Sequence, residues 1–330
     1  MPERERATPP PAPRRVLLLG ASGTIGRATA RALAARGHTV VCPLRPAAAR
    51  TGLEAVETRD ADVLDPASLA RDGLRGERFD ALVSCLASRT GRPAEAWALE
   101  HRAQAAALDL ARGAGVGHVV LLSAICVQKP RLAFQHAKLA FERELTASDV
   151  AWSIVRPTAY FKSLSGQIGR LRRGRAFLIF GDGRRTAAKP IGADDLGAYL
   201  ASCLDDPAKR NRVLPIGGPG PAITPREAGE TLFAALGKRP RFASVPFAAL
   251  DAIVATLAAG GRLSPRLADK AELARIGRYY ATESMLVLDP ATGRYDADAT
   301  PETGRETLSG HYERLVAGTL GDERGAHAVF

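Results

Sequence analysis

The sequence lacks the features that mark several classes of protein. Its four cysteines, Cys42, Cys85, Cys126 and Cys203, lie far apart, so no pair has the spacing of a zinc or iron–sulfur site. We therefore expect reduced, buried, structural thiols and no metal centre. No stretch approaches the roughly 18 uncharged apolar residues of a membrane-spanning helix. These absences predict a soluble, cytoplasmic protein that touches a membrane at most peripherally.

We expect no targeting signal in the first fourteen residues. Residues 1–14 are rich in Pro, Arg and Glu. They contain acidic residues and precede no apolar core, which excludes a signal peptide and a transit peptide. We expect residues 1–14 and residues 321–330 to be loose tails.

The charge is strongly positive, at +11, but the basic residues are scattered. The densest cluster is residues 170–175, which contain four arginines. It could be a solvated face, or it could meet an acidic small molecule or an anionic membrane. Scattered arginine of this kind gives little support to nucleic-acid binding, and we expect no nucleic-acid partner.

A glycine-rich turn is the most informative feature that is present. Residues 15–19 read as a buried parallel strand, and residues 24–36 as a helix. The three glycines between and within these elements allow a sharp turn and a close approach to a pyrophosphate at the helix start. We therefore expect a dinucleotide to be bound here, with contacts from Gly20, Ser22, Gly23, Thr24, Ile25 and Gly26.

The next strand indicates which dinucleotide. Residues 39–44 read as a strand that is apolar after Thr39, and they are followed by Arg45 instead of an acidic residue. An acidic side chain there would hold the ribose hydroxyls of NAD, whereas a guanidinium suits the ribose phosphate of NADP. NADPH is therefore the expected cofactor. Asp62 and Val63, after the third strand, are expected near the adenine.

Strand and helix patterns then alternate along the chain. Such alternation predicts parallel strands joined by right-handed crossovers, an α/β doubly wound Rossmann sheet. Ligands should meet beyond the carboxyl ends of the strands, where we place Leu86, Ala87, Ser123, Pro157 and Thr158. We expect the NADP-binding core to span residues 15–157. A smaller substrate-binding part should span residues 158–320, with some segments returning to the core. The strands are expected at residues 79–86, 119–123 and 152–155, and the helices at residues 94–114 and 134–145.

Two further helices are expected in the second part. Thr224, Pro225 and Glu227 have the order of a capping box, so a helix should begin there. Residues 247–259 are apolar nearly all round. They are expected to form a buried helix, the alternative being one wall of an apolar pocket.

Ser123 and the pair Phe134 and Lys138 resemble the catalytic layout of the short-chain dehydrogenase/reductase superfamily. In that superfamily a serine follows this strand, and Tyr-x-x-x-Lys places a phenol and an ammonium on one helical face. Phe134 has no proton to donate, while Lys138 is retained and could bond the nicotinamide ribose. Reduction of a carbonyl needs the phenol, whereas reduction of a carbon–carbon double bond does not.

Longer segments resemble a narrower family, the NADPH-dependent divinyl chlorophyllide 8-vinyl reductases. The segments lie in the same order across nearly the whole chain: residues 122–130, 134–139, 156–164, 180–183, 189–191, 214–220 and 279–286. The resemblance implies reduction of the 8-vinyl group of a magnesium chlorin to ethyl, in chlorophyll or bacteriochlorophyll biosynthesis. It also implies a tetrapyrrole substrate and a setting at the inner face of a photosynthetic membrane.

Several side chains are candidates for the chemistry of such a reaction. Lys138 is the principal catalytic candidate. Tyr160 and His136 are weaker ones, as proton donors or, for His136, as a ligand of the substrate magnesium. Each could instead be a packing residue. A wide apolar slot could be lined by Phe161, Phe177 and Phe180, and the substrate propionate could be bound by Lys162, Arg172 or Arg173.

Two other functions remain open on the sequence alone. The missing tyrosine is compatible with a non-catalytic NADP-binding regulator or assembly subunit. The fold and cofactor are equally compatible with a reductase of another apolar substrate. The preferred pigment precursor, the proton donor, the hydride face and the oligomeric state are not specified by any pattern in the chain.

Overall fold

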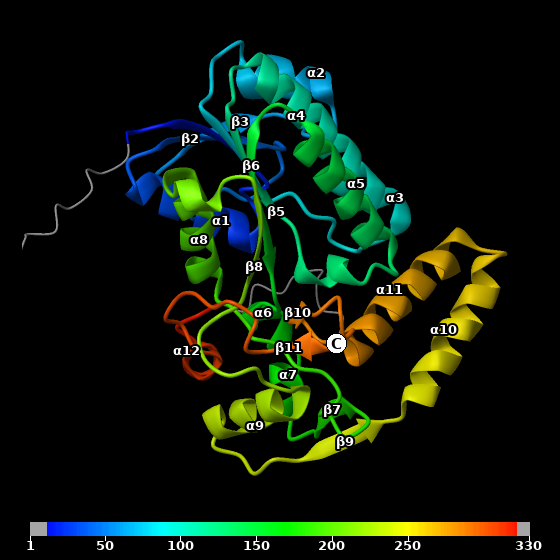
Figure 1. The fold of residues 1–330 in the computed structure, drawn as a ribbon. Coiled ribbons are helices and arrows are strands. Elements are labelled where there is room, and N and C mark those ends of the chain that lie inside the picture. The colour runs from blue at the N-terminus through cyan, green and yellow to red at the C-terminus, as the bar shows by residue number, and fades with distance from the viewer. Residues whose placement is uncertain (1–11, 322–330) are drawn as a thin grey trace, which may run out of the picture.

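A computed structural model describes residues 12–321 and has a single large parallel sheet at its centre (Figure 1). The strand order is β3-β2-β1-β4-β5-β6-β8, and all neighbouring strands are parallel. This confirms the α/β doubly wound Rossmann fold. The strands are β1 (Arg15–Leu19), β2 (Thr39–Leu44), β3 (Glu57–Asp60), β4 (Ala81–Ser84), β5 (His118–Leu122), β6 (Ala151–Pro157) and β8 (Arg212–Ile216).

The strands form because their side chains are buried on both faces of the sheet. In β1, Val16 and Leu18 belong to one apolar cluster, and Leu17 and Leu19 to another on the opposite face. All four side chains are fully buried. A run of Val and Leu without alternation is what a parallel strand covered by helices requires.

Helices cover both faces of the sheet. On one face, α1 (Thr24–Ala35) packs against α8 (Ala193–Asp205). The other face is covered by α4 (Ala103–Gly113) and α5 (Ala133–Ala147), together with the π-helical turn η2 (Trp97–Arg102) that continues α3 (Pro93–Ala96). The helix expected at residues 94–114 is thus formed by three consecutive helical segments. Shorter elements on this part of the chain are α2 (Pro66–Ser68), the π-helical η1 (Leu69–Leu74) and the 3-10 turn η3 (Ile125–Gln128).

The C-terminal part of the chain builds a second apolar core and also extends the sheet. In the second core, α9 and α12 pack together beside β7, which pairs with β9. The capping box at Thr224 is present, and α9 begins at Pro225 as expected. The elements outside the main sheet are α6 (Phe161–Leu164), α7 (Ile168–Arg172), β7 (Phe177–Phe180), η4 (Pro207–Lys209), α9 (Pro225–Ala235), β9 (Phe242–Val245), β10 (Val287–Leu288), β11 (Tyr295–Asp296) and α12 (Leu308–Ala317).

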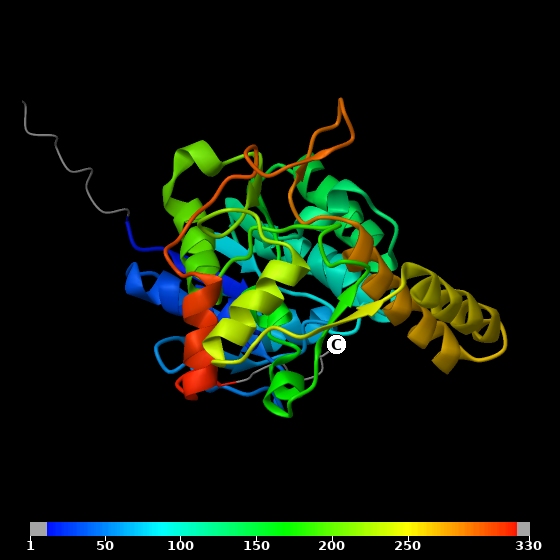
Figure 2. The same ribbon diagram turned by 90° about the horizontal axis from the view of Figure 1, so that it is seen from below.

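Two helices form an arm that projects from the body, as Figures 1 and 2 show from two directions. They are α10 (Phe247–Gly261) and α11 (Pro265–Thr282), which pack against each other. The expectation that residues 247–259 form a buried helix is wrong in its burial, although the helix exists. Among the residues of α10, only Leu250 is buried. An apolar helix is expected to pack against other apolar surface. Within the described residues, however, α11 covers only one side of α10.

The predicted tails lie mostly outside the described residues, which exclude residues 1–11 and 322–330. Residues 1–14 were expected to form a loose tail, but Arg14 at the end of this segment is hydrogen-bonded to the folded part of the chain. Its backbone N–H donates to Nδ1 of His38 at 3.3 Å, and its carbonyl accepts from Thr39. None of the helices in residues 12–321 combines the length and the apolar character needed to cross a membrane.

Candidate functional site

The glycine-rich turn lies at the carboxyl end of β1 and can hold no side chains at two positions. Gly20 has a φ of +77°, and a Cβ there would lie 2.5 Å from the carbonyl oxygen of Cys85. A Cβ on Gly26 would lie 2.1 Å from the carbonyl oxygen of Gly20. The backbone of the turn therefore lies too close to the end of β4 and to the first turn of α1 for a side chain to fit between them. This geometry leaves bare backbone at the place where a pyrophosphate would approach.

The start of α1 has the electrostatics of an anion site. Gly23 is its N-cap, no side chain caps the helix, and its first turn holds no acidic residue. The helix dipole therefore favours a phosphate at this end of the helix. Lys162 adds a positive charge, with its Nζ 2.9 Å from Oγ1 of Thr24. The structure places Lys162 at the cofactor turn, although the sequence suggested it for a substrate propionate.

The residues expected around the adenosine lie at the ends of the next two strands. Arg45 directly follows β2 and is exposed. Asp62 follows β3; its Oδ1 accepts from the N–H of Leu64 at 3.0 Å, and its own N–H donates to Ser68. Asp62 therefore shapes the turn that positions Val63, while Arg45 extends outward at the same edge of the sheet.

Lys138 forms a buried ion pair, which makes it the best defined charged residue of the site. Its Nζ lies 2.7 Å from Oε2 of Glu100, and the two side chains are 9% and 2% exposed. The other oxygen of Glu100 accepts from the N–H of Ser88 at 2.9 Å. Glu100 belongs to the π-helical turn η2, a type of distortion that frequently marks functional sites. Glu100 thus links Lys138 to the loop that follows β4.

Ser123 belongs to a different network from Lys138. Its hydroxyl donates to Oε1 of Glu142 at 2.5 Å, and Glu142 pairs with Arg156. The backbone N–H of Ser123 donates to the carbonyl of Val155. In this state Ser123 therefore fastens the end of β5 to α5 and β6.

The hydroxyl of Tyr160, a half-buried residue, lies in a buried environment near Cys85, Cys126 and Glu100. Burial raises the pKa of this phenol well above its usual value, and the nearby Cys85, Cys126 and Glu100 raise it further. Burial likewise raises the pKa of the Cys85 thiol to about 12. Burial therefore favours the protonated forms of Tyr160 and Cys85.

The last turns of α11 close this side of the site. The hydroxyl of Tyr279 donates to the carbonyl oxygens of Cys126 at 2.8 Å and Lys129 at 3.1 Å. The hydroxyl of Tyr280 lies 3.8 Å from Sγ of Cys126, and its ring remains 40% exposed. Burial of this hydroxyl raises the pKa of Tyr280, and Cys126 and Tyr160 add to the effect. Tyr280 thus lies beside Tyr160 with an open side toward solvent.

The other sequence candidates are not grouped with Lys138. His136 is exposed on α5. Phe161 and Phe177 are 2% and 6% exposed and pack into the second core, and the ring of Phe180 lies 6.3 Å from that of Phe247. Burial in the second core gives Phe161 and Phe177 no open face toward a ligand.

The basic cluster of residues 170–175 is partly used within the protein. Arg172 donates to the carbonyls of Leu315 and Val316 near the end of α12, and Arg170 donates to the carbonyl of Ala176. Arg173 is exposed. These contacts hold the guanidinium of Arg172 against the end of α12, although Arg172 and Arg173 are both exposed.

The remaining expected cofactor residues line the carboxyl edge of the sheet. Leu86 is buried and Ala87 exposed after β4. Pro157 ends β6, and the N–H of Thr158 donates to the carbonyl of Ile216 on β8. These positions therefore lie at the same edge of the sheet as the glycine turn, Lys138 and Tyr160.

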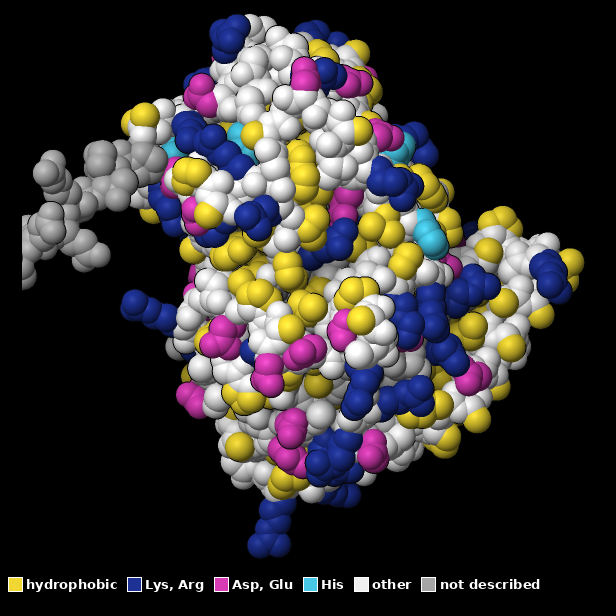
Figure 3. All heavy atoms as spheres, viewed as in Figure 1, with side chains coloured by type: hydrophobic (Ala, Val, Ile, Leu, Met, Phe, Trp, Pro, Cys, Tyr) yellow, Lys and Arg dark blue, Asp and Glu magenta, His cyan; other side chains and the backbone are white. Residues whose placement is uncertain are grey.

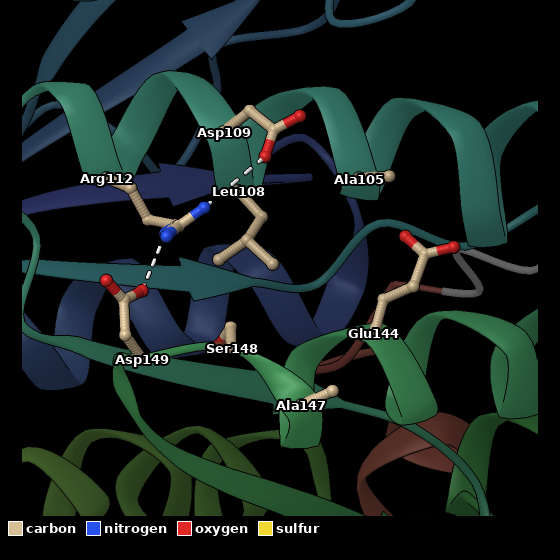
Figure 4. Close-up of a pocket in the computed structure, with 8 residues that line it drawn as sticks. All are labelled: Ala105, Leu108, Asp109, Arg112, Glu144, Ala147, Ser148 and Asp149. Carbon is tan, nitrogen blue, oxygen red and sulfur yellow. Dashed lines mark hydrogen bonds and ion pairs between the residues drawn. The ribbon is translucent and has the colours of Figure 1, made fainter.

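A hollow elsewhere on the surface is unrelated to this edge (Figure 4). Its volume is about 490 Å³, and it lies between the ends of α4 and α5 that precede the amino ends of β5 and β6. An ion pair between Arg112 and Asp149, 2.7 Å long, crosses it. Its place at the opposite end of the strands separates it from the cofactor turn.

Sequence reasoning missed three residues of the site, namely Glu100, Glu142 and Tyr280. Glu142 lies on α5, whose other acidic residue, Glu144, is exposed, and no local pattern distinguishes a buried carboxylate such as Glu142 or Glu100 from an exposed one. Tyr280 lies more than 100 residues from the strands it approaches. The one available signal was the segment 279–286, which resembles the vinyl reductases but has no recognisable chemistry of its own.

Comparison with known proteins agrees with this geometry. A family model described as NAD(P)H-binding matches residues 20–207. The chain is 46% identical to a protein of Oryza sativa subsp. indica and 45% identical to one of Zea mays, both named divinyl chlorophyllide a 8-vinyl-reductase, chloroplastic. Each match covers 96% of this chain and 82% of the relative.

A solved structure supports the fold. The NADPH-dependent quinone oxidoreductase QOR2 of Escherichia coli, complexed with NADPH, superposes with a TM-score of 0.62 at 19% identity. The match covers 91% of this chain and 99% of that one. Together with the two plant relatives and the bare glycine turn, these matches show that the chain belongs to the NAD(P)H-binding proteins and, within them, to the family of divinyl chlorophyllide a 8-vinyl-reductases.

Proposed function

We propose that this protein uses NADPH to reduce the 8-vinyl group of divinyl chlorophyllide, or of the corresponding protochlorophyllide, to ethyl. The observation that carries the proposal is the 46% identity to a named 8-vinyl-reductase over 96% of the chain. The site adds a physical reason. Phe134 replaces the phenol that carbonyl reduction requires, while Lys138 and the glycine turn remain.

The residues at the carboxyl edge fit a dinucleotide with a ribose phosphate. The glycine turn and the start of α1 provide backbone for the pyrophosphate, and Lys162 provides a cation beside it. Arg45 is suited to the extra phosphate of NADPH. Asp62 and Val63 would border the adenine. Toward the nicotinamide we place Leu86, Ala87, Ser123, Lys138, Pro157 and Thr158.

Bound NADPH supplies a hydride, and the protein has to align its nicotinamide with the vinyl group within about 3 to 3.5 Å. Lys138, held by Glu100, would orient the ribose through its ammonium. Tyr160, whose hydroxyl lies near Glu100, is the proposed proton donor. The hydroxyl of Tyr280 lies near Sγ of Cys126, and the exposed side of Tyr280 would border the substrate.

The apolar macrocycle would lie against the open side of this edge, between Tyr280 and the region of Phe180. Phe180 faces Phe247 at the base of the arm, so both belong to the same side of the second core. Phe161 and Phe177 would support this wall from behind. Arg173, which is exposed, is the candidate for the propionate. We also propose that the protein works at the surface of a photosynthetic membrane, where apolar pigment precursors collect.

The decisive experiment is incubation of the purified protein with divinyl chlorophyllide and either NADPH or NADH. We expect a product with two additional hydrogens and a Soret band at shorter wavelength, formed in dependence on NADPH. Phe134→Tyr should leave this activity largely intact, because the reaction does not use a phenol at that position. Tight NADPH binding without turnover would contradict the proposal and would favour a non-catalytic NADP-binding regulator or a different apolar substrate.

A further inference from the structure

The arm formed by α10 and α11 exposes more apolar surface than its place in the fold explains. Helix α10 contains one charged residue, Asp251, in 15 residues. Ile253 is 50% exposed, and Leu263, at the turn between the helices, is 91% exposed. Figure 3 shows hydrophobic side chains spread along the arm where it projects from the body. An exposed apolar surface of this extent marks an interaction site.

Several exposed residues of α10 follow a helical spacing and form one stripe. Ala249, Ile253, Thr256 and Ala259 follow one another at intervals of three or four residues and are exposed, as are Ala252 beside them and Ala248, Asp251 and Ala255 elsewhere on the helix. Leu263 continues the stripe at the tip of the arm. Residues at this spacing lie on one face of a helix. The stripe therefore runs along one face of α10 and is open to solvent.

The opposite face of α10 is fixed to α11, so the arm is a defined structure. A Cβ on Gly260 would lie 2.8 Å from Cδ1 of Leu267, and a Cβ on Gly261 would lie 3.0 Å from Cα of Ala268. The two helices thus approach closely at the turn. Asp251 is neutralised by an ion pair with Arg278 of α11. The one acidic group of α10 is thereby removed from the apolar stripe.

Basic side chains surround the tip of the stripe. Arg262, Arg266 and Lys270 are exposed, and no ion pair connects any of them to another residue within the described range 12–321. The acidic residues of α11 are already paired, Asp269 with Arg92 and Glu272 with Arg275, both at 3.2 Å. The tip therefore presents Leu263 among three positive charges.

We propose that the α10–α11 arm docks on an anionic lipid bilayer. The stripe would lie in the interface with Leu263 below the level of the headgroups, and Arg262, Arg266 and Lys270 would bind lipid phosphates. An apolar helical face bordered by basic side chains is the pattern of helices that lie in the membrane surface. A helix of 15 residues is about 22 Å long, which suits this orientation.

The arm also connects the membrane to the site, because α11 carries Tyr279 and Tyr280 at its other end. An apolar substrate dissolved in the bilayer would need to cross only the length of this helix to reach Tyr280. This part of the inference rests on the proposed function and deepens it. A second copy of this chain is a weaker occupant, since a contact between two tips would bring Arg262 and Arg266 of both chains together.

The test is sedimentation of the full chain with vesicles of phosphatidylcholine, with and without one quarter phosphatidylglycerol. We expect binding to the anionic vesicles that weakens as salt is added. The variant Ile253→Ser/Leu263→Ser should bind at least tenfold more weakly, and Arg262→Ser/Arg266→Ser should lose the preference for anionic lipid. Val213→Ser is the matched control, because Val213 is 40% exposed on β8, outside the arm, and its loss should leave binding unchanged.

Three results would overturn the proposal. The wild-type chain could remain in the supernatant with anionic vesicles, the serine variant could bind as well as the wild type, or light scattering could show a dimer that only Ile253→Ser/Leu263→Ser dissociates. Reduction of detergent-dissolved substrate should be unchanged in the serine variant. If vesicle binding holds while no variant or wild type reduces the vinyl group, the proposed function fails and the docking surface stands.

Discussion

Strand β1 and helix α10 have similar apolar character and opposite surroundings. Leu17, Leu18 and Leu19 are fully buried between two layers of helices, whereas Ile253 and Leu263 on the arm are 50% and 91% exposed. The difference shows that apolar sequence predicts a need for an apolar neighbour, and that the neighbour need not be part of the same chain. In β1 the neighbours are the helices that also build the cofactor edge. In α10 the neighbour on the outer face has to come from outside.

The comparison predicts its largest effect at the buried pair Lys138 and Glu100. Glu100→Gln leaves the ammonium of Lys138 buried without a charge partner, which should lower the free energy of unfolding by about 3 to 5 kcal/mol. Vinyl reduction should fall at least tenfold, because Lys138 is no longer held. Denaturant unfolding and steady-state kinetics measure the two effects.

A double variant separates stability from chemistry at this pair. Glu100→Gln/Lys138→Met removes both charges and should regain about 2 kcal/mol of the lost stability, since no buried charge is left unpaired. Activity should stay low because the ammonium is absent. Near-normal steady-state kinetics with NADPH in this double variant would show that Lys138 has no catalytic role.

The second prediction compares the two apolar regions directly. Leu18→Ala creates a cavity between closely packed layers and should cost about 2 to 5 kcal/mol of unfolding free energy. Leu263→Ala removes a side chain that is exposed and should change it by less than about 0.5 kcal/mol. Denaturant unfolding of the protein without lipid measures both. A large loss in Leu263→Ala would mean that the arm folds back onto the body in solution.

The third prediction concerns His118, which is buried at the start of β5. Burial lowers the pKa of His118 from its usual 6.5 to about 4. The unfolded chain therefore binds more protons than the folded protein between these values, so stability is lost as the pH falls from about 7 toward 4. We expect His118 to account for about 2 kcal/mol of this loss. His118→Gln should flatten the pH dependence of unfolding, and an unchanged slope would refute the assignment.

The smallest predicted effect is on cofactor choice. Arg45→Glu should shift the ratio of NADPH to NADH use by about tenfold or more toward NADH, through loss of the guanidinium and repulsion of the ribose phosphate. Arg31→Glu is a control on the outer side of α1, where Arg31 pairs with Asp194. If the two variants have the same cofactor ratio, Arg45 does not contact the phosphate.

The sequence was sufficient for the parts of the fold that depend on local pattern. The strand ending at Leu19, the glycine turn and the helix from Thr24 follow from residue types at fixed spacing, and the capping box at Thr224 follows from three side chains. The burial of residues 247–259 was predicted wrongly because hydrophobicity does not specify which surface covers a helix. Periodicity alone gives no tertiary partner.

The cofactor turn could be predicted from residue types at fixed spacing after a strand. Lys138 could be proposed only because Ser123, Phe134 and Lys138 resemble the layout of the short-chain dehydrogenase/reductase superfamily. Glu100 and Tyr280 could not, since the first depends on a π-helical turn and the second on the direction of an arm far along the chain. Neither feature leaves a local signal in composition or spacing.

The measurement that tests the central claim most directly is the isotope content of the reduced pigment formed with NADPH deuterated at either face of its nicotinamide C4. If the cofactor edge aligns the nicotinamide with the vinyl group, one of the two labelled forms should place one deuterium on the new ethyl group, the second hydrogen coming from the solvent. An ethyl product without deuterium from both labelled forms would show that the hydride does not pass directly from the cofactor to the vinyl group. That result would contradict the account.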